Sequence, residues 1–171
     1  MIDCAVSPLP RQAYVPGKTA RPSEGPVFAV ARRAPRITDP AGWASNEAYL
    51  FGVHLYRNGF FWEAHEVWEP VWQGARPSSA ERHLMQGLIQ LANGCLKVAM
   101  GRLAAARRLA DHAGRCFDEA ALGGSVRLMG IDPRAAAKDA RDFLDFLQAA
   151  QDSSCEEILA ERPALTLIDA A

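Results

Sequence analysis

Residues 59–74 read Gly-Phe-Phe-Trp-Glu-Ala-His-Glu-Val-Trp-Glu-Pro-Val-Trp-Gln-Gly. This segment holds three of the four tryptophans of the chain, Trp62, Trp68 and Trp72. It also contains His65 and Glu69, a His and Glu pair at the spacing of one helical turn. In a helix, Glu69 lies only about 40° around the axis from His65, and both side chains fall among the aromatic residues. The segment therefore predicts a helix that carries a candidate site on its most aromatic face.

Apolar spacing and end signals predict helices on both sides of this segment. We expect an all-α fold, because Asn58-Gly59 and Gly101 are typical of tight turns between packed helices. The expected architecture is a compact bundle of about five helices, built from two helical hairpins plus a C-terminal helix. The five helices are predicted at residues 45–57, 59–74, 79–100, 102–121 and 132–151.

The two ends of the chain differ in composition from its centre. Residues 1–40 hold seven of the eleven prolines and six basic against three acidic residues. Because proline disrupts helices, we expect an irregular basic arm that is dispensable for folding, with at most a short extended piece at residues 27–30. The helical domain is predicted at residues 41–151. Residues 152–171 are expected to form an extended C-terminal tail.

Overall composition narrows the classes of partner. The formal net charge is −1, and the chain has no apolar run as long as a membrane span. We therefore expect neither a membrane nor a nucleic-acid partner. The four cysteines are scattered without a Cys-x-x-Cys pair, which favours a cytoplasmic protein with reduced thiols. The sequence leaves open a homo-oligomer or a protein partner.

The central part of the chain resembles a known family. The resemblance rests on the run Asn58 to Trp72, followed by Glu81-Arg82 and by Gln86-Gly87-Leu88-Ile89-Gln90-Leu91-Ala92. This pattern is similar to domain-of-unknown-function family 309, small bacterial and archaeal helical proteins with a His-x-x-x-Glu-x-x-Trp/Tyr motif. Here the motif is His65, Glu69 and Trp72, and the resemblance extends from about residue 44 to residue 122, more weakly to residue 148.

The resemblance implies a compact helical fold and a metal-binding role for the motif, in a family without an established activity. Pro70 inside the motif departs from the family pattern and predicts a kink in the helix.

The His65 and Glu69 pair has the chemistry of two metal ligands. Zinc or a similar divalent metal accepts imidazole nitrogen and carboxylate oxygen, and it needs three or four ligands in all. A third ligand is expected from another element, with His83 and His54 as candidate histidines and His112 as a further one. Glu66 and Glu63 project in directions that are poor for sharing the site.

A polar row on the helix at 79–100 offers further donors. Its residues recur at steps of three and four and interrupt an otherwise apolar helix: His83, Gln86, Gln90, Asn93 and Lys97. One interpretation is a solvated edge, and the other is a polar wall that faces the pair. In the second case the pocket is lined by Trp62, Trp68, Trp72, Gln86 and Gln90.

Two functions of different classes follow. The first is a small cytosolic metal-binding protein that uses His65 and Glu69, with metal-dependent hydrolysis as its candidate activity. The alternative is a metal-free helical-hairpin interaction module, similar to tetratricopeptide repeats, in which His65 and Glu69 form a structural buried polar pair. The sequence lacks the His-Glu-x-x-His protease pattern, the nucleophile elbow and the phosphate-binding loop. Whether the protein is an enzyme stays open.

Overall fold

The computed structural model describes residues 7–168, and within this range the fold is entirely helical. It contains no strand there, only one isolated bridge between Leu128 and Ile131. A short 3-10 turn, η1, covers Trp43–Ser45. The seven α-helices are α1 (Pro26–Arg33), α2 (Glu47–Arg57), α3 (Phe61–Gly74), α4 (Ala80–Ala99), α5 (Leu103–Ala121), α6 (Pro133–Ala149) and α7 (Cys155–Ala160).

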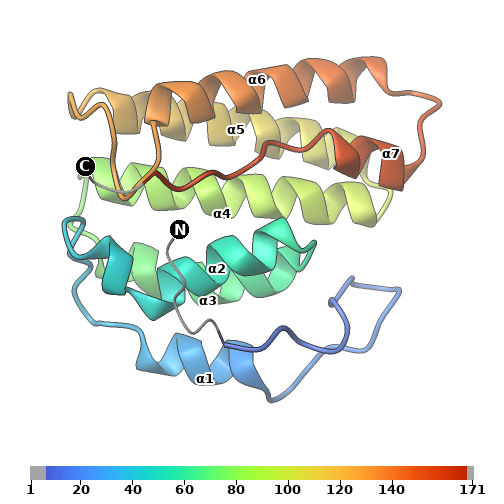
Figure 1. The fold of residues 1–171 in the computed structure, drawn as a ribbon. Coiled ribbons are helices and arrows are strands. Elements are labelled where there is room, and N and C mark those ends of the chain that lie inside the picture. Colours follow the sequence, from blue (N-terminus) through green and yellow to red (C-terminus); the bar gives the residue numbers. More distant parts are fainter. Residues whose placement is uncertain (1–6, 169–171) are drawn as a thin grey trace.

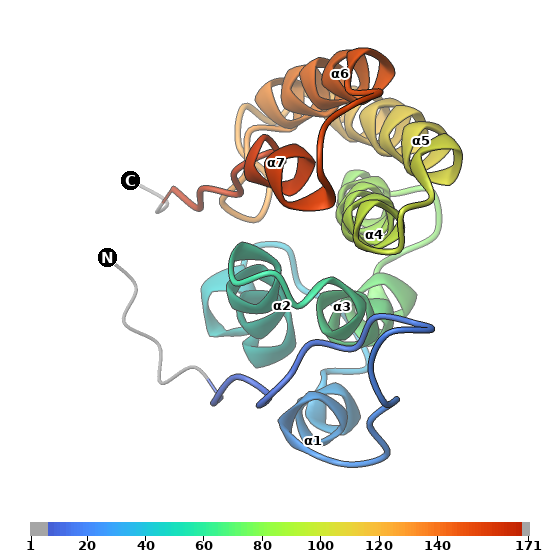
Figure 2. The same cartoon turned by 90° about the vertical axis from the view of Figure 1, so that its right-hand side faces the viewer.

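The helices stack in the order of the chain. Helices α2 to α5 each pack on the next helix along the sequence, while α1 packs mainly on α3 and α7 packs on α4. In the end-on view, α5 and α6 lie above α4 and α7, the α2–α3 pair lies below them, and α1 forms the last layer (Figures 1 and 2). The predicted all-α bundle is confirmed, and its five helices correspond to α2 to α6.

Side-chain caps fix where several helices begin. The Asn46 side chain accepts a hydrogen bond from the Tyr49 backbone N–H and starts α2, one residue after the predicted start at residue 45. Ser79 caps α4, and Asp132 caps α6 ahead of Pro133, at the positions where these two helices were predicted to begin. The two predicted glycine turns, at Gly59 and Gly101, have φ angles of 83° and 72°. Only glycine adopts this conformation without strain, so these turns set the short connections of the hairpins.

A buried tryptophan joins α2 to α3. Trp68 is 0% exposed, and its indole Nε1 donates a hydrogen bond to the Tyr49 carbonyl at 3.1 Å. The ring lies against the bare backbone of Gly52, where an added Cβ would come within 2.2 Å of Nε1. The absence of a side chain at Gly52 therefore allows the two helices to approach closely.

The N-terminal arm contains a helix, so the prediction of a short extended piece at residues 27–30 was wrong. Residues 26–33 form α1, which begins at a proline, the helix position where proline is tolerated. Val27 and Val30 are 3% and 1% exposed and belong to the core. Arg33 also pairs with Glu47 of α2 at 2.7 Å. The spacing of two valines three residues apart was too short a pattern to outweigh the surrounding prolines.

The segment before α1 lies across α3 (Figure 2). The Tyr14 backbone N–H donates to Glu63 Oε1 at 2.7 Å, and the Tyr14 ring packs edge-on against Trp62. Lys18 reaches the Ala99 carbonyl at the end of α4. Glu63 is fully buried here, and its second oxygen has no hydrogen-bond partner. Burial raises the pKa of the Glu63 carboxyl, and the Tyr14 N–H partly opposes this effect.

The C-terminal region begins with α7, where an entirely extended tail was predicted. Ser154 and Glu157 form a reciprocal capping box that starts this helix. Residues 163–168 then follow the bundle without helix or strand (Figure 1). The Tyr56 hydroxyl donates to the Pro163 carbonyl, which fixes this strip to α2.

No helix in residues 7–168 combines the length and the apolar character that crossing a bilayer requires.

The contact between Gly52 and Trp68 predicts the sign of a substitution. Gly→Ala in a helix normally stabilises by about 0.4–1 kcal/mol, but Gly52→Ala should destabilise by about 1–3 kcal/mol because the methyl group overpacks a buried ring. Gly94→Ala is the matched control, since its Cβ would meet nothing closer than 3.5 Å. Urea unfolding of both variants measures the difference. Equal stabilisation by both substitutions would contradict the role of Gly52.

The buried valines of α1 reverse the expectation that the arm is dispensable. Replacing Val27 and Val30 together by Ala should lower the free energy of unfolding by about 2–4 kcal/mol, because each site loses buried methyl groups. A chain that lacks residues 1–40 should melt at a lower temperature than the full chain. An unchanged melting temperature for both proteins would show that α1 does not contribute to the stability of the bundle.

The environment of Glu63 predicts a pH dependence of stability. The pKa of Glu63 is raised above the ordinary 4.5, so the folded state binds more protons than the unfolded state just above that pH. By linkage, stability therefore falls as the pH rises from about 4.5 through the raised pKa. Glu63→Gln, which keeps an acceptor for Tyr14, removes this loss. Its stability relative to the wild type should increase between pH 4.5 and pH 7, and parallel pH profiles would contradict the argument.

Candidate functional site

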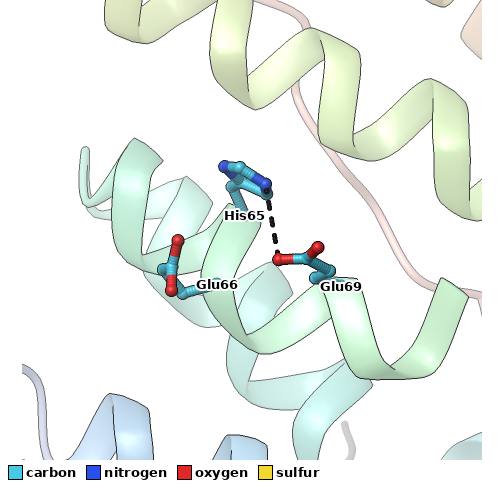
Figure 3. A group of neighbouring side chains, drawn as sticks. All are labelled: His65, Glu66 and Glu69. Atoms are coloured by element: carbon cyan, nitrogen blue, oxygen red, sulfur yellow. Dashed lines mark ion pairs between the residues drawn. The ribbon is translucent and has the colours of Figure 1, made fainter. Parts of the chain in front are cut away.

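The middle of α3 brings three possible metal ligands together. One donor atom from each of His65, Glu66 and Glu69 lies within 4.8 Å of the other two. His65 Nε2 and Glu69 Oε2 are 3.9 Å apart (Figure 3). The pair meets because residues four apart lie one above the other on a helix. We refer to these three residues as the His–Glu cluster.

Glu66 belongs to this cluster, although its direction on the helix was predicted to be poor. It lies about 100° around the helix from His65. Figure 3 shows the Glu66 and Glu69 carboxylates on opposite sides of the imidazole ring, with His65 pointing toward α4. Glu66 has three rotatable side-chain bonds, so its carboxylate can lie closer to His65 than the direction of its Cα–Cβ bond indicates. The prediction from helix directions did not include this reach.

The cluster is open to solvent, and this contradicts the interpretation of a buried polar pair. The side chains of His65 and Glu69 are 28% and 45% exposed. The other carboxylate oxygen of Glu69 accepts a hydrogen bond from the Gln73 amide at 3.4 Å. Ion pairs at this exposure contribute about 0–1 kcal/mol to stability. The pair is therefore not needed to satisfy groups in a dry core.

The three histidines proposed as additional ligands, His54, His83 and His112, lie on other helices: α2, α4 and α5. His54 is on α2, beside Asn58, whose side-chain nitrogen is 3.5 Å from His54 Nδ1. His83 is half-buried on α4. Across residues 7–168, the cluster on α3 is the one group of three or more His, Cys, Asp or Glu side chains close enough to share an ion, and it includes none of these three histidines.

The three tryptophans have different surroundings. Trp62 packs against Tyr14 and Phe28 of the N-terminal arm, and Trp68 is buried against α2. Trp72 is half-buried, and the guanidinium of Arg82 stacks on it at 4.3 Å from the ring centre. Its indole Nε1 is buried without a hydrogen-bond partner. Two of these rings therefore serve packing, and a role of the three tryptophans in lining a pocket stays a prediction.

Gln86 and Gln90 are half-buried on α4. In the part of the chain that the structure describes, no direct hydrogen bond joins either amide to His65 or Glu69. A role for the two glutamines at the site stays a prediction.

A surface groove begins beside the cluster. It has a volume of about 350 Å³ and runs between α1 and α3. Its lining combines Glu69 with an exposed arginine, an amide and apolar groups: Phe28, Ala31, Arg32, Pro70 and Gln73.

Helix α3 runs without a break through Pro70, which has no N–H to donate to the Glu66 carbonyl. The contribution of the N-terminal arm to the groove was not predicted, because the formation of α1 was not predicted.

The spacing of His65 and Glu69 can be compared with that of two ligands on one divalent metal. Zinc binds histidine nitrogen and carboxylate oxygen at about 2.0–2.2 Å, so two donors in a tetrahedral site lie roughly 3.4 Å apart. The observed 3.9 Å between His65 and Glu69 is close to this spacing. Both side chains end in rotatable groups at the surface and can close the difference.

One of three comparisons with known proteins gives a match. The sequence profile of the family described as "Domain of unknown function (DUF309)" matches residues 49–109, from α2 through the first part of α5. Neither the search of curated proteins nor the search of solved structures found a match. The matched region includes the His–Glu cluster and excludes α1, α6 and α7. Over residues 49–109 the chain therefore resembles the family of domain of unknown function DUF309.

Proposed function

We propose that the protein binds a divalent transition metal ion, zinc or a similar ion, through His65, Glu69 and Glu66. The observation that carries this proposal is the grouping of three donor atoms within 4.8 Å on one solvent-accessible helix face. Imidazole nitrogen with carboxylate oxygen is a common donor combination for zinc.

The number of donors favours a site with an open position. Three protein ligands leave a fourth position of a tetrahedral zinc ion for water, the arrangement of catalytic rather than structural zinc sites. A metal held there supplies Lewis acidity and lowers the pKa of its bound water. Hydrolysis of a small substrate is the candidate reaction, with the groove beside Glu69 as the space for that substrate.

The openness of the cluster separates this proposal from the structural alternative. A buried His–Glu pair is costly to break because it leaves an unsatisfied polar group in the core. The exposed pair observed here has little such cost. A metal-free interaction module remains the rival function, and it gives the opposite result in a metal titration.

Thermal unfolding with and without metal tests the proposal. Protein without a histidine tag should melt at a higher temperature in added zinc, manganese or nickel, because a ligand bound only to the folded state stabilises it. At one hundred times the dissociation constant the gain is about 2.7 kcal/mol, or roughly 5–10 °C for a chain of this size. His65→Ala and Glu69→Gln should abolish the shift, and Glu66→Gln should reduce it.

His112→Ala is the matched control, since it removes a half-buried histidine of α5 outside the cluster. This variant should keep the full metal shift. Without metal, His65→Ala should lie within about 1 kcal/mol of the wild type. No metal shift in the wild type contradicts the proposal. A metal-free loss of 2 kcal/mol or more in His65→Ala restores the structural interpretation.

A further inference from the structure

A second pocket lies between the C-terminal end of α2 and the segment that follows α7. Its volume is about 400 Å³. The lining comes from the last turn of α2, the end of α7 and the start of the extended tail: Tyr56, Arg57, Ala160, Arg162, Pro163, Ala164, Leu165 and Thr166. No member of the His–Glu cluster lines it. We call it the arginine pocket, because Arg57 and Arg162 are its only charged lining residues.

Arg162 is held in a fixed orientation. Its NH1 donates to the Leu159 carbonyl at 2.7 Å, and its NH2 donates to the Arg57 carbonyl at 2.8 Å. The guanidinium also lies over the rings of Tyr56 and Phe61, 5.9 and 5.6 Å from their centres. A guanidinium that is already oriented loses little conformational entropy when it binds a ligand.

The Arg57 side chain donates one hydrogen bond to a backbone carbonyl, and its other N–H donors have no partner in residues 7–168. Its Nε donates to the Leu165 carbonyl at 2.7 Å, which ties the side chain to the extended tail on the other side of the pocket lining. An arginine carries five N–H donors in a planar fork. The remaining donors of Arg57 have no protein partner among residues 7–168, and its side chain is exposed.

The charge of the two arginines is not neutralised by the protein. Their partners are backbone carbonyls, which are dipoles and carry no net charge. Within the described range neither arginine pairs with a carboxylate, and no acidic residue lines the pocket. The positive charge of Arg162 is also felt nearby: burial raises the pKa of the Cys95 thiol to about 12, and Arg162 acts against this rise. The pocket therefore combines net positive charge with oriented donors.

We propose that the arginine pocket binds a small organic phosphate monoester. Two guanidinium groups match a phosphate monoester, which carries close to two negative charges at neutral pH. Guanidinium forks bind phosphate oxygens in pairs. The Thr166 hydroxyl is a further donor in the lining, and Pro163, Ala164 and Leu165 offer apolar contact to the organic part. The pocket volume lies within the range of small-molecule sites, about 300–1,000 Å³.

Calorimetric titration of the full chain with phenyl phosphate, at constant ionic strength, tests this proposal. The wild type should bind saturably, and benzyl alcohol, an uncharged aromatic probe, should not bind. Inorganic phosphate should bind more weakly than phenyl phosphate, because it lacks the apolar group. Arg57→Gln should weaken binding of phenyl phosphate at least tenfold, Arg57→Lys should weaken it less, and Thr166→Val should weaken it severalfold.

The control is Arg108→Gln, which removes an exposed arginine of α5 outside the pocket. It should bind phenyl phosphate as the wild type does. Because Arg162 also caps carbonyls of α2 and α7, Arg162→Gln is expected to lower the melting temperature, so Arg57 and Thr166 carry the test. Unchanged affinity in Arg57→Gln, equal weakening by Arg108→Gln, or absence of saturable binding to the wild type would each overturn the proposal.

Discussion

The contact between Trp68 and Gly52 is the constraint on which the arrangement of the central helices depends. The indole occupies the space that a side chain at residue 52 would need, and it donates its N–H to the Tyr49 carbonyl of the same helix. This contact sets both the distance between α2 and α3 and the rotation of α3 about its axis. With Trp68 turned inward, His65, Glu69 and Glu66 lie about 60°, 100° and 160° around the helix from it, toward the solvent-accessible side. The site is thus positioned by a packing contact on another face of the helix that carries it.

The same device recurs between α4 and α5. An added Cβ at Gly87 would lie 2.5 Å from the buried ring of Phe117. Helix α5 presents a row of small buried residues toward its neighbours: Ala106, Ala110, Ala113, Gly114 and Ala120. The helices can pack closely because α5 has small residues at the contact and because the Phe117 ring of α5 lies against Gly87 of α4. The bundle is therefore a series of neighbouring contacts, each of which fixes the next helix.

The two ends of the chain complete the surfaces that the central helices leave open. Helix α1 forms one wall of the groove beside Glu69, and residues after α7 form one wall of the arginine pocket. Both walls come from segments outside the family match at residues 49–109. The matched region thus holds the His–Glu cluster, whereas the terminal segments supply part of the lining of both hollows. Ligand selectivity is expected to reside in those segments.

Local chemistry was enough to predict much of this protein. Periodic apolar residues, caps at Ser79 and Asp132, and the glycine turns specify five helices, because each signal acts within a few residues of the chain. The meeting of His65 and Glu69 follows from helix geometry alone. Pattern alone was insufficient for the eight residues of α1, whose two buried valines are held by contacts with α3.

Only the tertiary structure decided which groups are buried and which face water. His65 and Glu69 were placed on the aromatic face of their helix, and the alternative function required them to be a buried pair. Both are solvent-accessible, because no element covers that part of α3 completely. Glu63 was set aside as pointing away, and it is the carboxyl that the N-terminal segment buries. Burial depends on what packs opposite a residue, and that partner lies about fifty positions away along the chain in the case of Tyr14 and Glu63. Sequence periodicity describes one helix at a time, so it determined which residues share a face of each helix. The packing of segments distant in the sequence determined which of those faces are buried and which contact solvent.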